Sequence, residues 1–303
     1  MAHQHDPCIH HPRRTSSETI RPLVVVLILT GCYMVLEFLG GLAANSLALM
    51  ADAGHMLTDV GATGLALFAV WFAEHPASQQ KTYGYYRLEI LAAFVNGIVL
   101  VLISGWIVYE AFTRLHQPLA VQGNILTLVA AGGLLVNLIS AGMLMRTAAN
   151  HVNTRAVLIH IFSDVLGALG AIIAGLGILF CHASWLDPMV SILIALLVLY
   201  SAWKLIEETT HLLLEGCPHH LSVEEIESAL TGLHEIRAVH DLHVWSITQG
   251  KEALSVHIVV DDVEHYCPQL VTKIQTILKE KFGLTHLTVQ LETPDFEEDT
   301  IHF

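Results

Sequence analysis

The chain has 303 residues, of which 53% are hydrophobic and only 14% are charged, and its formal net charge is −14 at pH 7. Its mean hydropathy of +0.57 is typical of a membrane protein and excludes an ordinary soluble domain. The acidic balance argues against nucleic acid as a partner, because a polyanion would be repelled.

Six stretches are long and apolar enough to cross a lipid bilayer, since a helix needs about 20 apolar residues to span the hydrocarbon core. We expect spanning helices at residues 22–44, 46–72, 88–112, 125–145, 152–181 and 185–206. Residues 1–21 form a polar tail that lacks the apolar core of a cleavable signal peptide. This tail could collect zinc weakly or be dispensable, and its candidate ligands are His3, His5, Cys8, His10 and His11.

The distribution of lysine and arginine predicts the orientation of these helices. Eight of these residues would lie on one side of a six-helix chain, and they are Arg13, Arg14, Arg21, Lys81, Arg87, Arg146, Arg155 and Lys204. Only Arg114 would lie on the other side. Because loops rich in lysine and arginine stay on the cytoplasmic side of a membrane, both termini are expected in the cytoplasm.

The second and fifth expected helices each carry a histidine followed four positions later by an aspartate. The two pairs are His55 with Asp59 and His160 with Asp164, and residues four apart share one face of a helix. A carboxylate in hydrocarbon costs roughly 2.5–3.5 kcal/mol or more, so such residues usually mark an ion pathway. A lone histidine could merely bond to a neighbouring helix, but two facing pairs suit a tetrahedral divalent metal such as zinc. Asp52 could bind the metal directly or support its ligands.

Residues 207–303 are expected to form a soluble domain in the order α-β-β-α-β, with eighteen acidic and five basic side chains. Ser222 and Glu225 form a capping box that opens a helix towards Gly232. Strands are expected at residues 236–247 and 253–260, a helix at 268–282, and a last strand containing Leu287, Val289 and Leu291.

Strand alternation suggests a second group of metal ligands in this soluble domain. Leu254, Val256 and Ile258 share the core face of their strand, so His257 points away from the core. By the same alternation Glu292 points away from the core on the last strand. A three-stranded sheet covered by helices on one face would display these two side chains together.

Several segments resemble the cation diffusion facilitator family, in particular its bacterial zinc exporters of the ZitB and CzcD type. The segment SLALMADAGHMLTD (Ser46–Asp59) is similar to the second transmembrane helix of that family. Further similar segments are YGYYRLE (residues 83–89), His160-x-x-Ser-Asp164, LEG (214–216) and HDLHVW (240–245). Together they cover nearly the whole chain.

The resemblance implies an α-helical membrane protein with six transmembrane helices and a cytoplasmic α+β ferredoxin-like domain similar to metallochaperones. The expected organisation is a cytoplasmic tail at 1–21, a membrane domain at 22–206 and a regulatory and dimerisation domain at 207–303. The implied activity is export of Zn²⁺, with Cd²⁺ or Co²⁺ possible, in exchange for H⁺. The implied setting is a homodimer in the lipid bilayer of the bacterial inner membrane.

Carried over residue by residue, the transport site consists of His55, Asp59, His160 and Asp164. A cytoplasmic metal site is implied at His240, His257 and Glu292, where Gln290 replaces a histidine of some relatives and makes a two-metal cluster doubtful. His243 could support this site or face the core, and we favour the core. Arg87 and Glu215 match an interdomain charge contact.

Three rival functions are less well supported by the sequence. A metalloenzyme would use zinc to activate water, yet the sequence lacks an HExxH motif and four protein ligands would close the site. A passive channel would not need a proton gradient, and a sensor would not move metal. We therefore expect a secondary transporter and not an enzyme.

Overall fold

The computed structural model describes residues 17–73, 79–148, 154–248, 250–261 and 263–296, which contain eight helices and three strands. Contacts within the chain form two compact units. The first comprises Met1–Val70 and Asn96–Trp203, and the second comprises Trp71–Val95 and Lys204–Phe303.

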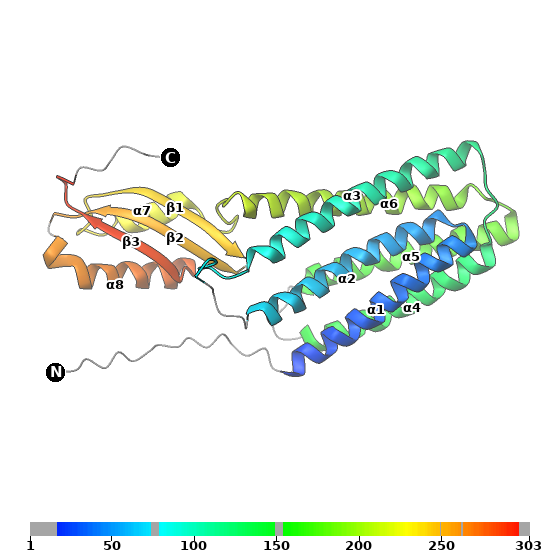
Figure 1. The fold of residues 1–303 in the computed structure, drawn as a ribbon, viewed down its shortest axis with the longest axis horizontal. Helices are drawn as coiled ribbons and strands as arrows, with labels where there is room; N and C mark the ends of the chain where they lie inside the picture. Colours follow the sequence, from blue (N-terminus) through cyan, green and yellow to red (C-terminus); the bar gives the residue numbers. More distant parts are fainter. Residues whose placement is uncertain (1–16, 74–78, 149–153, 249, 262, 297–303) are drawn as a thin grey trace. The chain divides into compact units, whose positions relative to one another are not determined.

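Long apolar helices form the first unit, although the ends of three of them, at residues 71–73, 87–95 and 204–213, belong to the second (Figure 1). They are α1 (Ser17–Ala44), α2 (Leu47–Ala73), α3 (Arg87–His116), α4 (Gly123–Ala148), α5 (Thr154–Cys181) and α6 (Leu186–Leu213). Within the described residues, α1, α3, α4, α5 and α6 contain a stretch long and apolar enough to cross a membrane. That set leaves out α2, many of whose later side chains lie outside the described part of the chain.

The helix bounds mostly follow the expected stretches, but α1 begins at Ser17 and not at residue 22, and α6 continues to Leu213 where the apolar run predicted an end at residue 206. Glu207 and Glu208 end the apolar run, but glutamate is a good helix former and does not end a helix. The sequence pattern therefore marked the end of the apolar surface and not the end of the helix.

Two buried clusters hold the first unit together, and α2 takes part in both. One cluster joins α1, α2, α4 and α5, and its small members, such as Ala48 and Ala171, allow close helix packing. The other joins Ala51 of α2 to α3 and α6. Large apolar side chains such as Leu128 and Phe180 remain exposed, as expected of helices that face lipid.

A three-stranded sheet and two helices form the core of the second unit. The strands β1 (Ala238–Thr248), β2 (Lys251–Val259) and β3 (His286–Glu292) lie in the order β1-β2-β3. β1 pairs with β2 in antiparallel fashion and β2 pairs with β3 in parallel. The helices α7 (Val223–Thr231) and α8 (Val263–Phe282) pack in one cluster against the face that carries Leu254, Val256 and Ile258.

The expected element order of this unit agrees with the structure, and so does the helix cap. The Glu225 backbone N–H donates to Ser222 Oγ over 3.1 Å, and α7 ends at Thr231. The helix α8 begins at Val263, earlier than the predicted residue 268, so Pro268 lies inside it. A proline inside a helix removes one backbone hydrogen bond without necessarily ending it.

The expected core position of His243 is wrong, because β1 contains an irregularity that alternation could not reveal. The pairing of β1 with β2 shifts between His240 and His243. Asp241, inside this shift, has a φ of 49°, a left-handed conformation that aspartate tolerates better than most residues. The extra residue turns His243 outwards, to the same face as His240.

Candidate metal sites

A histidine and an aspartate from different helices meet inside the first unit. His55 Nε2 on α2 lies 2.9 Å from Asp164 Oδ1 on α5, and the two side chains are only 20% and 12% exposed. Each residue sits on the apolar helix where the sequence placed it. This contact joins one member of each His-Asp pair.

The other two members of these pairs are Asp59 and His160, whose side chains lie outside the described part of the structure. Their backbones are described: Asp59 follows His55 by one turn of α2, and His160 precedes Asp164 by one turn of α5. The complete four-residue site therefore remains a prediction.

Two further acidic residues are buried close to this contact. Asp52 of α2 is 3% exposed, and Glu37 of α1 is completely buried and close enough to interact with it electrostatically. On α5, a Cβ added to Gly167 would lie 3.5 Å from Asp52 Oδ1, so this carboxylate lies beside the α5 backbone. The sequence suggested Asp52 as a supporting residue, but only the packing reveals its proximity to Glu37.

The second unit brings His240, His257 and Glu292 together, one from each strand of the sheet. Their candidate ligand atoms all lie within 4.8 Å of one another. His240 Nε2 is 3.0 Å from Glu292 Oε2, and His257 Nδ1 is 2.9 Å from Glu292 Oε1. The Glu292 side chain is only 4% exposed. Two imidazoles and a carboxylate in this arrangement suit a divalent cation such as zinc.

Neighbouring polar residues surround this three-residue group. Gln290 Nε2 donates to Glu292 Oε1 over 2.8 Å, so the glutamine holds the carboxylate. Asp241 Oδ2 is 3.8 Å from His257 Nε2, and Asp241 Oδ1 is 2.9 Å from His243 Nε2. Asp241 was not among the predicted ligands, and its position inside the strand irregularity is what directs it towards both histidines.

Arg87 and Glu215 form an ion pair, with Arg87 Nη2 2.7 Å from Glu215 Oε1. Both belong to the second compact unit, and their side chains are 43% and 58% exposed. Lys251 Nζ lies 3.7 Å above the Tyr86 ring, so the residues before α3 also contact the hairpin of β1 and β2. The predicted charge contact is present, while an interdomain role for it stays a prediction.

Comparisons with known proteins cover nearly the entire chain. The transmembrane domain of cation efflux proteins matches residues 23–214, and the cytoplasmic domain of cation efflux proteins matches residues 218–294. A cadmium, cobalt and zinc/H(+)-K(+) antiporter of Bacillus subtilis (strain 168) is 42% identical over 91% of this chain and 90% of its own length. The zinc transporter ZitB of Escherichia coli (strain K12) is 39% identical over 96% of this chain and 93% of its own.

Two further matches are to the same transporter of Cupriavidus metallidurans. Its metal cation efflux system protein CzcD is 36% identical over 98% of this chain and 91% of its own. The solved metal-bound C-terminal domain of CzcD is 32% identical and covers 24% of this chain and 99% of that chain, with a TM-score of 0.23. From the family matches over both parts of the sequence and these near full-length relatives, we conclude that the chain belongs to the cation diffusion facilitator family and is a multi-pass membrane transporter with a cytoplasmic C-terminal domain, not an enzyme.

Proposed function

We propose that this transporter exports Zn²⁺ from the cytoplasm in exchange for protons, through a buried tetrahedral site of His55, Asp59, His160 and Asp164. The observation that carries the proposal is the 2.9 Å contact between His55 Nε2 and Asp164 Oδ1, which joins α2 to α5 inside an apolar bundle. Buried ionisable residues in membrane helices usually mark a pathway for ions.

The direction of the two helices supports the inclusion of Asp59 and His160. The chain runs in opposite directions along α2 and α5 (Figure 1). One turn forward from His55 on α2 and one turn back from Asp164 on α5 therefore lead the same way along the bundle. Since His55 meets Asp164, we expect Asp59 and His160 to lie at one common level of the bundle, one turn further on.

The chemistry of these residues accounts for antiport. Zn²⁺ binds neutral imidazole and ionised carboxylate, so its binding displaces protons from the ligands. When the metal leaves, the His55–Asp164 contact can hold a proton as an imidazolium–carboxylate pair. Alternating exposure of the same ligands to the two sides of the membrane would then exchange zinc for protons.

The choice of zinc rests on ligand chemistry and on the relatives. Imidazole nitrogen with carboxylate oxygen favours Zn²⁺ over Mg²⁺ or Mn²⁺, which prefer sites made of oxygen alone. Relatives are named as a zinc transporter and as a cadmium, cobalt and zinc antiporter. Cd²⁺ and Co²⁺ are accordingly the expected alternative substrates.

We further propose that His240, His257 and Glu292 bind a regulatory metal in the cytoplasmic domain, and that Arg87 and Glu215 connect this domain to the membrane domain. The three-residue group offers the right donors, and Glu292 is already oriented by Gln290. The proposed organisation is a tail at 1–21, a six-helix membrane domain at 22–206 and a dimerising domain at 207–303. The match of residues 218–294 to the cytoplasmic domain of cation efflux proteins supports dimerisation, and we propose a homodimer in the bacterial inner membrane.

X-ray absorption spectroscopy of the zinc-loaded transporter tests the buried site. A variant that lacks residues 2–11 and carries His240→Ala and His257→Ala removes the candidate ligands of the tail and of the cytoplasmic domain, so that the remaining zinc reports on the membrane site. We expect two nitrogen and two oxygen neighbours at about 2.0–2.2 Å. Asp59→Ala in the same background should abolish this signal. Sulfur neighbours, or a signal unaffected by Asp59→Ala, would contradict the assignment.

A further inference from the structure

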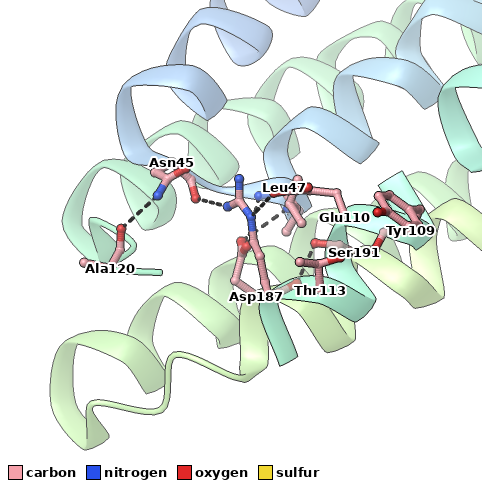
Figure 2. Close-up of polar contacts among 10 residues, drawn as sticks. Asn45, Leu47, Tyr109, Glu110, Thr113, Ala120, Asp187 and Ser191 are labelled. Carbon is pink, nitrogen blue, oxygen red and sulfur yellow. Dashed lines mark hydrogen bonds and ion pairs between the residues drawn. The ribbon is translucent and has the colours of Figure 1, made fainter. Parts of the chain in front are cut away.

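The first turn of α2 is capped by a carboxylate that belongs to another helix. Asp187, in the first turn of α6, accepts hydrogen bonds from Ser46 Oγ at 2.5 Å, from Leu47 N at 2.9 Å and from Ala48 N at 3.2 Å. Figure 2 shows Asp187 beside Leu47 at this helix end. Ser46 and Asp187 are both completely buried, so water cannot replace these bonds.

A second connection holds the turn that leads into α2. Arg114 of α3 donates from Nη1 to the Asn45 carbonyl oxygen over 2.7 Å, and its Nε donates to Glu110 over 3.0 Å. Asn45 itself has a φ of 53°, the left-handed conformation that asparagine tolerates in turns. The turn between α1 and α2 is thus bound by both α3 and α6 (Figure 2).

The carboxylate of Asp187 is well suited to this place. The first N–H groups of a helix have no partner inside the helix, and the helix dipole places partial positive charge there. A helix usually satisfies these groups with its own N-cap side chain. Ser46 does this in part, since its Oγ accepts from Leu49 N at 3.3 Å, while Asp187 adds a charged acceptor fixed to α6.

The cap and the proposed metal site lie on the same helix, at a fixed distance along its axis. His55 follows Leu47 by eight residues on the same helix, or about 12 Å along its axis. Between them, Ala48 and Ala51 belong to the two different buried clusters of the first unit. Sliding or turning of α2 relative to α6 would break the hydrogen bonds of this cap.

We propose that Asp187 is a positioning residue for metal binding, which holds α2 to α6 so that His55 is level with Asp164 of α5. This inference rests on the proposed function, because it assigns a role to Asp187 in forming the same zinc site. Without the connection, α2 samples other positions, and only a fraction of the molecules has a competent site. The apparent affinity for the metal falls by that fraction.

Zinc transport by the full-length protein in proteoliposomes tests this role. For Asp187→Asn we expect the zinc concentration at half-maximal rate to rise about tenfold, which corresponds to about 1.4 kcal/mol and lies within the range for a lost helix cap. The maximal rate per folded transporter should stay within about twofold, since the ligands themselves are intact. Ser191→Ala is the matched control, because Ser191 Oγ donates only to the Asp187 backbone carbonyl and leaves the carboxylate in place.

A double variant separates the connection between helices from capping alone. Ser46→Asp combined with Asp187→Asn places the charged cap on α2 itself and removes the charge from α6. If the connection to α6 matters, the half-maximal zinc concentration remains raised in this protein. Recovery to the wild-type value would overturn the proposal, because α2 would then need only a cap.

Two further outcomes keep the test decisive. If Asp187→Asn fails to fold, Ser46→Ala removes one of the three hydrogen bonds to Asp187 together with the weak bond from Leu49 N, and a rise of about threefold is expected. An unchanged zinc dependence in the folded variant would overturn the role of Asp187. Absence of zinc flux in the wild type would instead contradict the proposed function, so the two failures are distinguishable.

Discussion

Replacing Asp164 with asparagine should separate metal binding from helix packing. The amide has nearly the same shape, and its oxygen can still accept a hydrogen bond from His55 Nε2, which lies 2.9 Å from Asp164 Oδ1. It loses the negative charge that offsets the charge of the metal. Because the site is only 12% exposed at Asp164, water cannot readily supply the missing ligand.

The expected loss can be estimated from the coordination chemistry. Changing residues that merely orient metal ligands typically costs 10–100-fold in affinity, so loss of a charged ligand should cost about 100-fold or more. This corresponds to at least about 2.8 kcal/mol of binding free energy.

Competition for zinc between the purified transporter and a fluorescent chelator measures this loss. The Asp261→Asn variant is the matched control, because Asp261 pairs with Arg237 on the exposed surface of the cytoplasmic unit. The unfolding temperature without metal should change little in Asp164→Asn. Zinc affinity within threefold of wild type at the membrane site would refute the assignment of Asp164 as a ligand.

Three further predictions concern the second unit. Glu292→Gln should lower zinc binding by one ion per chain in equilibrium dialysis, and an unchanged stoichiometry would contradict the cytoplasmic site. Arg87→Ala, which breaks the contact with Glu215, should reduce transport while zinc affinity is kept; unchanged transport would count against a connecting role. The hydrogen bond from Lys273 lowers the pKa of Glu235, so this pair stabilises the fold above the ordinary carboxyl pKa and loses that effect as the pH falls through the lowered value. The deficit in melting temperature of Glu235→Gln at pH 7 should therefore shrink below the ordinary carboxyl pKa and disappear once the pH is below the lowered pKa of Glu235, and a deficit independent of pH would exclude this mechanism.

Local patterns in the sequence were sufficient to predict most of the elements. Apolar runs predicted the helices of the first unit, and the Ser222 cap predicted the start of α7. Strand alternation placed His257 and Glu292 on one face, where the structure brings them to within 2.9 Å. These features succeed because each depends on residues close together in the sequence.

Features that depend on packing between distant segments were not predictable in this way. The capping role of Asp187 was not predictable, because its partners Ser46 and Leu47 are far away in the sequence. His243 was misplaced because a one-residue shift in strand pairing reverses the direction of every later side chain. The proximity of Glu37 to Asp52 also requires knowledge of how α1 packs beside α2.

The most direct test of the central claim is zinc movement into proteoliposomes under an imposed proton gradient, with the internal pH recorded at the same time. Wild-type protein should move zinc only when protons flow the other way, and Asp164→Ala should abolish both movements. Zinc flux that ignores the gradient would indicate a channel, and tight zinc binding without flux would indicate a sensor. Either result would contradict antiport through the site that His55 and Asp164 begin to define.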